Sequence, residues 1–107
     1  MKRVGIIDYG AGNLMSVANA LKYLGLESVI SREKSVLEDC DRLILPGVGA
    51  FPAAMRSLEE AGLTDFVRAE AAKKPLLGIC LGMQMLFDES DEIEPCRGLG
   101  LIPGRVT

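Results

Sequence analysis

The chain has 107 residues, of which 49% are hydrophobic and 25% charged, and 12 Lys and Arg against 15 Asp and Glu give a formal net charge of −3. This length fits one domain and allows a core without disulfides or metals. The mildly acidic balance, without a Lys/Arg run, argues against nucleic-acid binding. No apolar run approaches the roughly 20 residues that span a bilayer, so we expect a cytoplasmic protein without a membrane partner.

The composition also limits the chemistry. The three cysteines, Cys40, Cys80 and Cys96, are odd in number and lack C-x-x-C spacing, which indicates neither a disulfide framework nor a zinc site. Asp8 comes too early for a signal-peptide apolar region. The chain contains no histidine, so these residues cannot supply an imidazole as a base or a metal ligand. We expect reduced thiols and no metal.

The first half of the chain alternates short apolar runs with segments of helical period. Residues 4–7 are predicted as the first strand, followed by a Gly10-Ala11-Gly12 turn and by Asn13 as the N-cap of a helix. That helix has one apolar stripe and ends at a C′ glycine (Leu14, Val17, Ala18, Leu21 and Leu24, then Gly25). Strands are predicted over 27–30 and 42–45, with a short polar helix or turn over 32–39 between them.

The second half continues the alternation. Two helices are predicted over 51–61 and 63–73, broken near a glycine, with an apolar face packed on the sheet (Gly62; Met55, Leu58, Phe66, Val67 and Ala71). A short apolar strand over 76–79 leads directly into a helix over 81–87. The acidic run from Asp88 to Glu94 is predicted as a solvated loop, and residues 99–107 as the beginning of a further strand.

Together these elements predict an α/β fold with a doubly wound, mostly parallel sheet of flavodoxin-like order and helices on both faces. Three junctions from strand to helix are rich in glycine: 9–13, 46–51 and 78–82. The carboxyl ends of parallel strands open on the same edge of such a sheet, which is where ligands bind. We therefore expect the functional site at this edge.

Gly78-Ile79-Cys80-Leu81-Gly82 has the spacing of a nucleophile elbow, a strained turn from strand to helix that exposes one side chain. Glycines flank the nucleophile because β-carbons would clash in so sharp a turn. The following helix favours a thiolate at Cys80, and the N–H of Leu81 would face the oxyanion that forms in its attack. The alternative is a buried structural cysteine, but the strand–turn–helix context favours a nucleophile.

Two further segments are candidates for the same site. The amides of Pro46-Gly47-Val48-Gly49 could supply a second oxyanion donor, although an ordinary turn has the same composition. Gln84 lies one helical turn after Cys80 and could recognise an amide substrate, or equally could be a packing residue. Gly10-Ala11-Gly12 lacks the third glycine of a dinucleotide fingerprint, because Met15 occupies that position.

Four motifs together resemble the class I glutamine amidotransferases. They are Asp8-Tyr9-Gly10-Ala11-Gly12-Asn13-Leu14, Leu45-Pro46-Gly47-Val48-Gly49-Ala50-Phe51, Gly78-Ile79-Cys80-Leu81-Gly82-Met83-Gln84 and Gly98-Leu99-Gly100-Leu101-Ile102-Pro103-Gly104. The first two are most similar to the glutaminase subunits of imidazole glycerol phosphate synthases in histidine biosynthesis. The similarity runs along all 107 residues and corresponds to roughly the first half of the family's chain, as part of a single domain.

The resemblance implies a mechanism in which Cys80 attacks the carboxamide of glutamine, releases ammonia and leaves a thioester that water hydrolyses. It implies that Leu81 and the Gly47, Val48 and Gly49 segment hold the oxyanion and that Gln84 helps to seat glutamine. In the family, ammonia passes to a (β/α)₈-barrel cyclase subunit, which the loop at Asn13 would face in a heterodimer. The resemblance implies no cofactor.

The family completes its catalytic triad with a histidine and a glutamate from the second half of its chain. Because this chain has no histidine, we expect no meaningful glutaminase turnover from it alone. We also expect the fourth strand and its neighbours to have an exposed edge and an apolar patch that is prone to association. Two alternatives stay open: another cysteine-elbow hydrolase or chaperone-like protein, which the two upstream motifs disfavour, and a flavodoxin-like interaction module with an inert cysteine.

Overall fold

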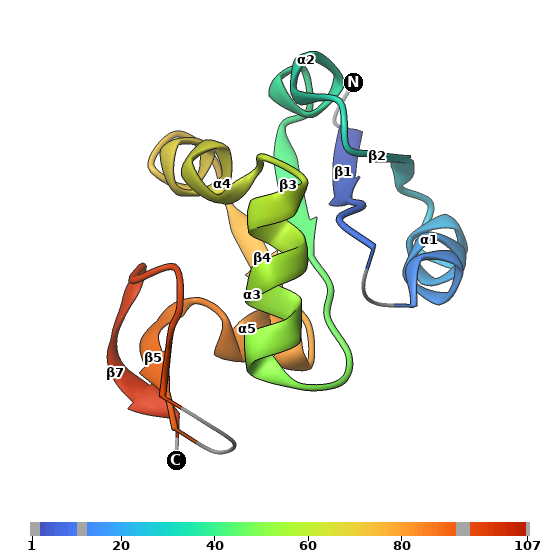
Figure 1. Cartoon of the computed structure of the whole chain (residues 1–107). Coiled ribbons are helices and arrows are strands. Elements are labelled where there is room, and N and C mark those ends of the chain that lie inside the picture. The colour runs from blue at the N-terminus through green and yellow to red at the C-terminus, as the bar shows by residue number, and fades with distance from the viewer. Residues whose placement is uncertain (1–2, 11–12, 92–94, 107) are drawn as a thin grey trace.

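The computed structural model describes residues 3–10, 13–91 and 95–106. Within these ranges, four parallel strands form the main sheet in the order β2-β1-β3-β4 (Figure 1): β1 (Arg3–Ile7), β2 (Glu27–Ser31), β3 (Arg42–Leu45) and β4 (Leu76–Gly78). Five helices connect or follow them: α1 (Leu14–Tyr23), α2 (Lys34–Glu38), α3 (Phe51–Glu60), α4 (Thr64–Ala71) and α5 (Leu81–Gln84). The predicted doubly wound parallel sheet is confirmed.

The main core lies on one face of the sheet. Successive strand residues point to opposite faces, so Ile7, Leu43 and Leu45 meet side chains from α2 to α5 in one cluster, which includes Leu37, Leu58, Leu63, Val67 and Met85. Val4, Ile6 and Ile44 are also buried, on the alternate face. That face is shared with α1, which contacts β1 and β2 (Figure 1). Helices therefore cover both faces, as predicted.

Helix α1 has the predicted ends but not the predicted burial. The Asn13 side chain accepts a hydrogen bond from the Ser16 amide, and Gly25, with φ of +80°, closes the helix by donating to the Lys22 carbonyl. The expected apolar stripe, however, is only half-buried, and Leu24 is 68% exposed. The reason is that α1 packs against β1 and β2, while no described element covers the same face over β3 and β4.

Strand β4 is an edge strand in the described part of the chain, which agrees with the exposed edge expected there. It ends at Gly78 rather than residue 79, pairs only with β3 among the described residues, and leaves Leu77 57% exposed. Two apolar grooves of about 400 and 370 Å³ lie along Ile44 and Leu77 on the α1 face. The expected apolar patch near the fourth strand is therefore present.

The segment after Cys80 departs most from prediction. The helix α5 ends at Gln84 rather than at residue 87, because the carbonyls of Met85 and Leu86 accept hydrogen bonds from Leu99 and Leu101 instead of from later helical amides. Phe87 then starts a second, three-stranded sheet, in the order β6-β5-β7 and apart from the main sheet in Figure 1: β5 (Phe87–Ser90), β6 (Cys96–Arg97) and β7 (Ile102–Val106).

The predicted acidic loop is consequently part strand. Asp88 and Glu89 lie in β5, where Asp88 accepts from the Gly104 amide and Glu89 pairs with Arg105 at 3.4 Å. Asp91, which follows β5, also lies 3.7 Å from Arg105, while residues 92–94 of the acidic run lie outside the described residues, as does the Ala11-Gly12 part of the first predicted turn.

A buried ion pair, which sequence periodicity did not predict, joins α4 to α2. Glu70 is 2% exposed, and its carboxylate lies 2.9 Å from Lys74 Nζ and 3.3 Å from Lys73 Nζ. Lys74 Nζ also donates to the carbonyls of Glu38 and Cys40, at 2.9 and 2.8 Å. The hydrogen bond from Lys74 outweighs burial and lowers the pKa of Glu70.

We expect Glu70→Gln to lower the free energy of unfolding at neutral pH by about 2 kcal/mol, because a charge-assisted buried bond is lost. The pKa of Glu70 lies below its ordinary value of 4.5 in the folded chain, so its stabilisation is present above about pH 4.5 and is lost as the pH falls through the folded value. Urea unfolding at about pH 7 and about pH 3.5 measures both effects.

The exposed Glu60→Gln on α3 is the matched control and should leave unfolding unchanged. If Glu70→Gln lost as much stability at acid pH as at neutral pH, the ion pair would not be the source of the effect.

Candidate active site

Cys80 sits at a strained turn between β4 and α5. Its φ of +55° and ψ of −124° make it the one non-glycine residue with positive φ in the described part of the chain, and its side chain is exposed. A β-carbon at position 78 would come within 2.6 Å of Met83 Cα, and one at Gly82 would overlap the Leu45 carbonyl oxygen. The flanking glycines are therefore required by close backbone packing, as the motif predicted.

The loop after β3 runs against this turn. The Ile79 amide donates to the Leu45 carbonyl at 3.0 Å, and the Leu81 amide donates to the Gly47 carbonyl at 3.2 Å. The Leu81 N–H was expected to face a developing oxyanion, but here it is paired with Gly47. A buried amide takes the nearest acceptor, and a substrate oxygen would have to displace that carbonyl.

The next two amides of the loop are differently placed. Val48 is 56% exposed, and Gly49 has φ of +91°. Within the described residues, neither amide donates a hydrogen bond. These amides are accessible donors on the loop that carries Gly47, which is the arrangement an oxyanion site needs.

An apolar groove of about 400 Å³ brings several predicted site residues together. Cys80, Gly47, Val48 and Asn13 all line it, together with Ser16, Val17, Ala20, Leu21, Ile44, Pro46, Leu77 and Ile79. Each of the three glycine-rich junctions, at 9–13, 46–51 and 78–82, contributes lining residues to this groove, so the predicted convergence at one edge of the sheet is seen. The remaining predicted residues lie off the groove: Leu81 is buried, Gln84 is half-buried on α5, and Gly49 is on the loop beyond it.

Tyr9 belongs to the motif that follows the first strand, but its residue type and spacing predicted no role for it. It follows β1 and is 3% exposed, and its hydroxyl donates to the Pro46 carbonyl at 2.5 Å and lies 3.3 Å from Met85 Sδ. Burial raises the pKa of Tyr9 to about 12. A polar aromatic residue at the carboxyl end of a central strand is the signal that could have identified it.

The other two cysteines are in different surroundings. Cys40 is buried, donates to the Val36 carbonyl at 3.4 Å, and has its pKa raised by desolvation. Cys96 is half-buried in β6. Among the described residues, no group of three or more His, Cys, Asp or Glu side chains could hold a metal ion, and no helix is long and apolar enough to cross a membrane.

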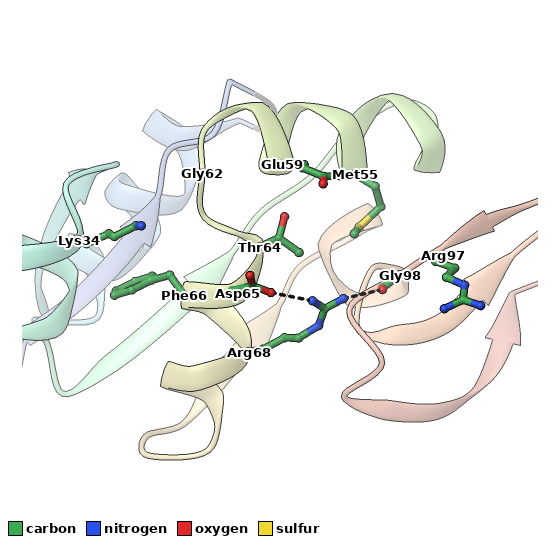
Figure 2. Close-up of a pocket in the computed structure, with 10 residues that line it drawn as sticks. All are labelled: Lys34, Met55, Glu59, Gly62, Thr64, Asp65, Phe66, Arg68, Arg97 and Gly98. Carbon is green, nitrogen blue, oxygen red and sulfur yellow. Dashed lines mark hydrogen bonds and ion pairs between the residues drawn. The ribbon is translucent and has the colours of Figure 1, made fainter.

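A larger cavity of about 450 Å³ lies away from Cys80, between α3, α4 and the segment at residues 97–98 (Figure 2). Arg68 and Asp65 are an ion pair in its lining. Arg68 donates to Asp65 at 3.1 Å and to the Leu99 and Gly98 carbonyls at 2.8 and 3.4 Å. Figure 2 shows this guanidinium joining α4 to Gly98, so the cavity lies where the helices meet the second sheet and does not contain Cys80.

Comparison with known proteins identifies the family. The model of the glutamine amidotransferase class-I family matches residues 5–92. Curated relatives include the imidazole glycerol phosphate synthase subunits HisH of Geobacillus kaustophilus, 58% identical over 104 residues, and of Exiguobacterium sibiricum, 48% identical over 103 residues. Each match covers 96% of this chain, but 49% and 53% of those proteins, so the chain spans about half of their length.

Solved structures agree with this fold. A crystal structure of a glutamine amidotransferase superposes with a TM-score of 0.78 at 30% identity, covering 95% of this chain and 54% of that one. A protein from Listeria monocytogenes described as a peptidase E superposes with a TM-score of 0.73 at 17% identity, covering 94% of this chain and 63% of that one, and shares the fold alone. The chain belongs to the class-I glutamine amidotransferase family.

Proposed function

We propose that this chain supplies the nucleophile of a glutaminase that provides ammonia to imidazole glycerol phosphate synthase in histidine biosynthesis. The observation that carries the proposal is the exposed Cys80 sulfur, held at a strained turn beside the Gly47–Gly49 loop. The relatives at 48–58% identity, all named as HisH subunits of that synthase, support the choice of pathway. A biosynthetic role of this kind places the protein in the cytoplasm, where its thiols stay reduced.

In the proposed reaction, the Cys80 thiolate attacks the side-chain carbonyl carbon of glutamine, and the electron pair of the carbonyl moves to its oxygen. The C–N bond then breaks, and the nitrogen takes a proton and leaves as ammonia. Water attacks the resulting glutamyl thioester, which releases glutamate and restores the thiol. No cofactor is needed for any of these steps.

The loop and the elbow would stabilise the oxyanion. The substrate oxygen takes the Leu81 N–H from Gly47 and also meets the amides of Val48 and Gly49, which make no other bond among the described residues. Gln84, one turn along from the nucleophile, would contact the bound glutamine. Each amide of such a site contributes about a hundredfold or more to the rate.

The general base must come from outside these residues, because the chain has no histidine. We propose that it comes from a polypeptide segment corresponding to the remainder of the full-length relatives. A second partner, a (β/α)₈-barrel cyclase subunit, would receive the ammonia, with Asn13 at the mouth of the groove facing it. All 107 residues would then be part of one amidotransferase domain.

One observation favours a different function. The Leu81 amide is already paired with Gly47, which is also what an inert elbow in an interaction module would show. The two functions differ in whether the sulfur reacts selectively with glutamine-like electrophiles.

Selective alkylation tests the nucleophile. We expect a chloroketone analogue of glutamine to label Cys80 in preference to Cys40 and Cys96, since Cys80 is the exposed thiol beside oxyanion donors. Glutamine should protect it, and peptide mass spectrometry locates the adduct. Cys96→Ser is the matched control, and its Cys80 should be alkylated as in the unmodified chain. Cys80→Ser should not be alkylated by the analogue. Equal labelling of Cys96, or labelling that glutamine leaves unchanged, would support the inert module instead.

Complementation tests the missing base. The chain alone should release no measurable glutamate from glutamine, because loss of a general base costs about 10² to 10⁴ in rate. Mixing it with the part of the Geobacillus kaustophilus relative that it does not match should restore release, measured by a coupled glutamate assay. Cys80→Ala in the mixture is the control and should abolish release. Turnover by the chain alone at the rate of the mixture would show that no outside base is needed.

A further inference from the structure

Three successive carbonyls anchor the loop after β3, and each has a different donor. The Leu45 carbonyl accepts from the Ile79 amide at 3.0 Å, and the Gly47 carbonyl accepts from the Leu81 amide at 3.2 Å. The carbonyl between them, of Pro46, accepts from the Tyr9 hydroxyl at 2.5 Å. Two donors thus belong to the elbow itself, and the third comes from the far side of β3, at the end of β1.

The Tyr9 hydroxyl is buried and is held by contacts on two sides. The side chain is 3% exposed, within the main core, and the oxygen also lies 3.3 Å from Met85 Sδ at the end of α5. A β-carbon at position 47 would lie 2.9 Å from the Tyr9 hydroxyl oxygen and 2.7 Å from the Gly82 amide nitrogen, so tyrosine, loop and elbow are in direct contact. With a pKa of about 12, the hydroxyl keeps its proton and remains a donor at any working pH.

We propose that Tyr9 is a positioning residue for the Gly47–Gly49 loop, holding Pro46 so that Val48 keeps its place in the groove beside Cys80 during the reaction. The inference rests on the proposed glutaminase function. When a substrate oxygen takes the Leu81 N–H, the Gly47 carbonyl loses its donor. The Tyr9–Pro46 bond then remains, together with the Ile79–Leu45 bond, to keep the loop in place.

The test compares Tyr9→Phe with Tyr23→Phe, a matched control whose side chain is 90% exposed on α1. Two rate constants for alkylation of Cys80 are measured in each protein. The first is for the chloroketone analogue of glutamine, whose carbonyl oxygen would occupy the oxyanion site. The second is for iodoacetamide, which reports the accessibility of the sulfur. We expect Tyr9→Phe to slow the first by about tenfold or more, since small displacements of catalytic groups are costly, and to leave the second nearly unchanged. Tyr23→Phe should change neither.

Unchanged rates in Tyr9→Phe would overturn the inference, and an equal fall in both rates would assign Tyr9 a merely structural role. Amide hydrogen exchange provides a second readout. The Leu81 amide, which donates to Gly47 on the loop that Tyr9 holds, should exchange faster in Tyr9→Phe than in Tyr23→Phe, and equal exchange in the two variants would overturn the Tyr9 inference. Failure of glutamine to protect Cys80 in the unmodified chain would instead overturn the proposed function.

Discussion

The site depends on the close approach of the β3 exit to the elbow after β4. Hydrogen bonds from Ile79 to Leu45 and from Leu81 to Gly47 hold the two segments together. The two segments can approach this closely only because Gly82 has no β-carbon, which would overlap the Leu45 carbonyl oxygen. At this contact Cys80 has a φ of +55°, and the residue is exposed. The exposed thiol and the amides of the neighbouring loop therefore meet at one strained backbone turn.

The surroundings of the elbow are unequal on the two faces of the sheet. On one face, the core, the Tyr9 hydroxyl and the Glu70–Lys74 pair tie the helices to one another and to the loops. On the other, α1 covers β1 and β2 and leaves an apolar groove beside Leu77. Cys80 therefore has a packed core on one side and an accessible surface on the other, which suits the proposed chemistry on a bound substrate.

The strands, the three glycine-rich junctions and the elbow could be predicted because they are local, and the strand order followed from the fold class that they indicate. Apolar runs of strand length, Asn13 as a cap, and glycines on both sides of Cys80 each indicate their structure within a few residues. The extent of α5 could not be predicted in this way. Its end is decided by Leu99 and Leu101, whose amides take the carbonyls of Met85 and Leu86 from a distant part of the chain.

Short motifs with strict steric demands were enough to predict the fold class, the family and the strained turn at Cys80. Only the tertiary structure decided the partners of the polar groups around it: the Leu81 amide on Gly47, the Tyr9 hydroxyl on Pro46, and Glu70 buried against Lys74. The physical reason is that a hydrogen-bond donor takes whichever acceptor folding brings nearest, and that acceptor is set by packing between segments far apart in the chain.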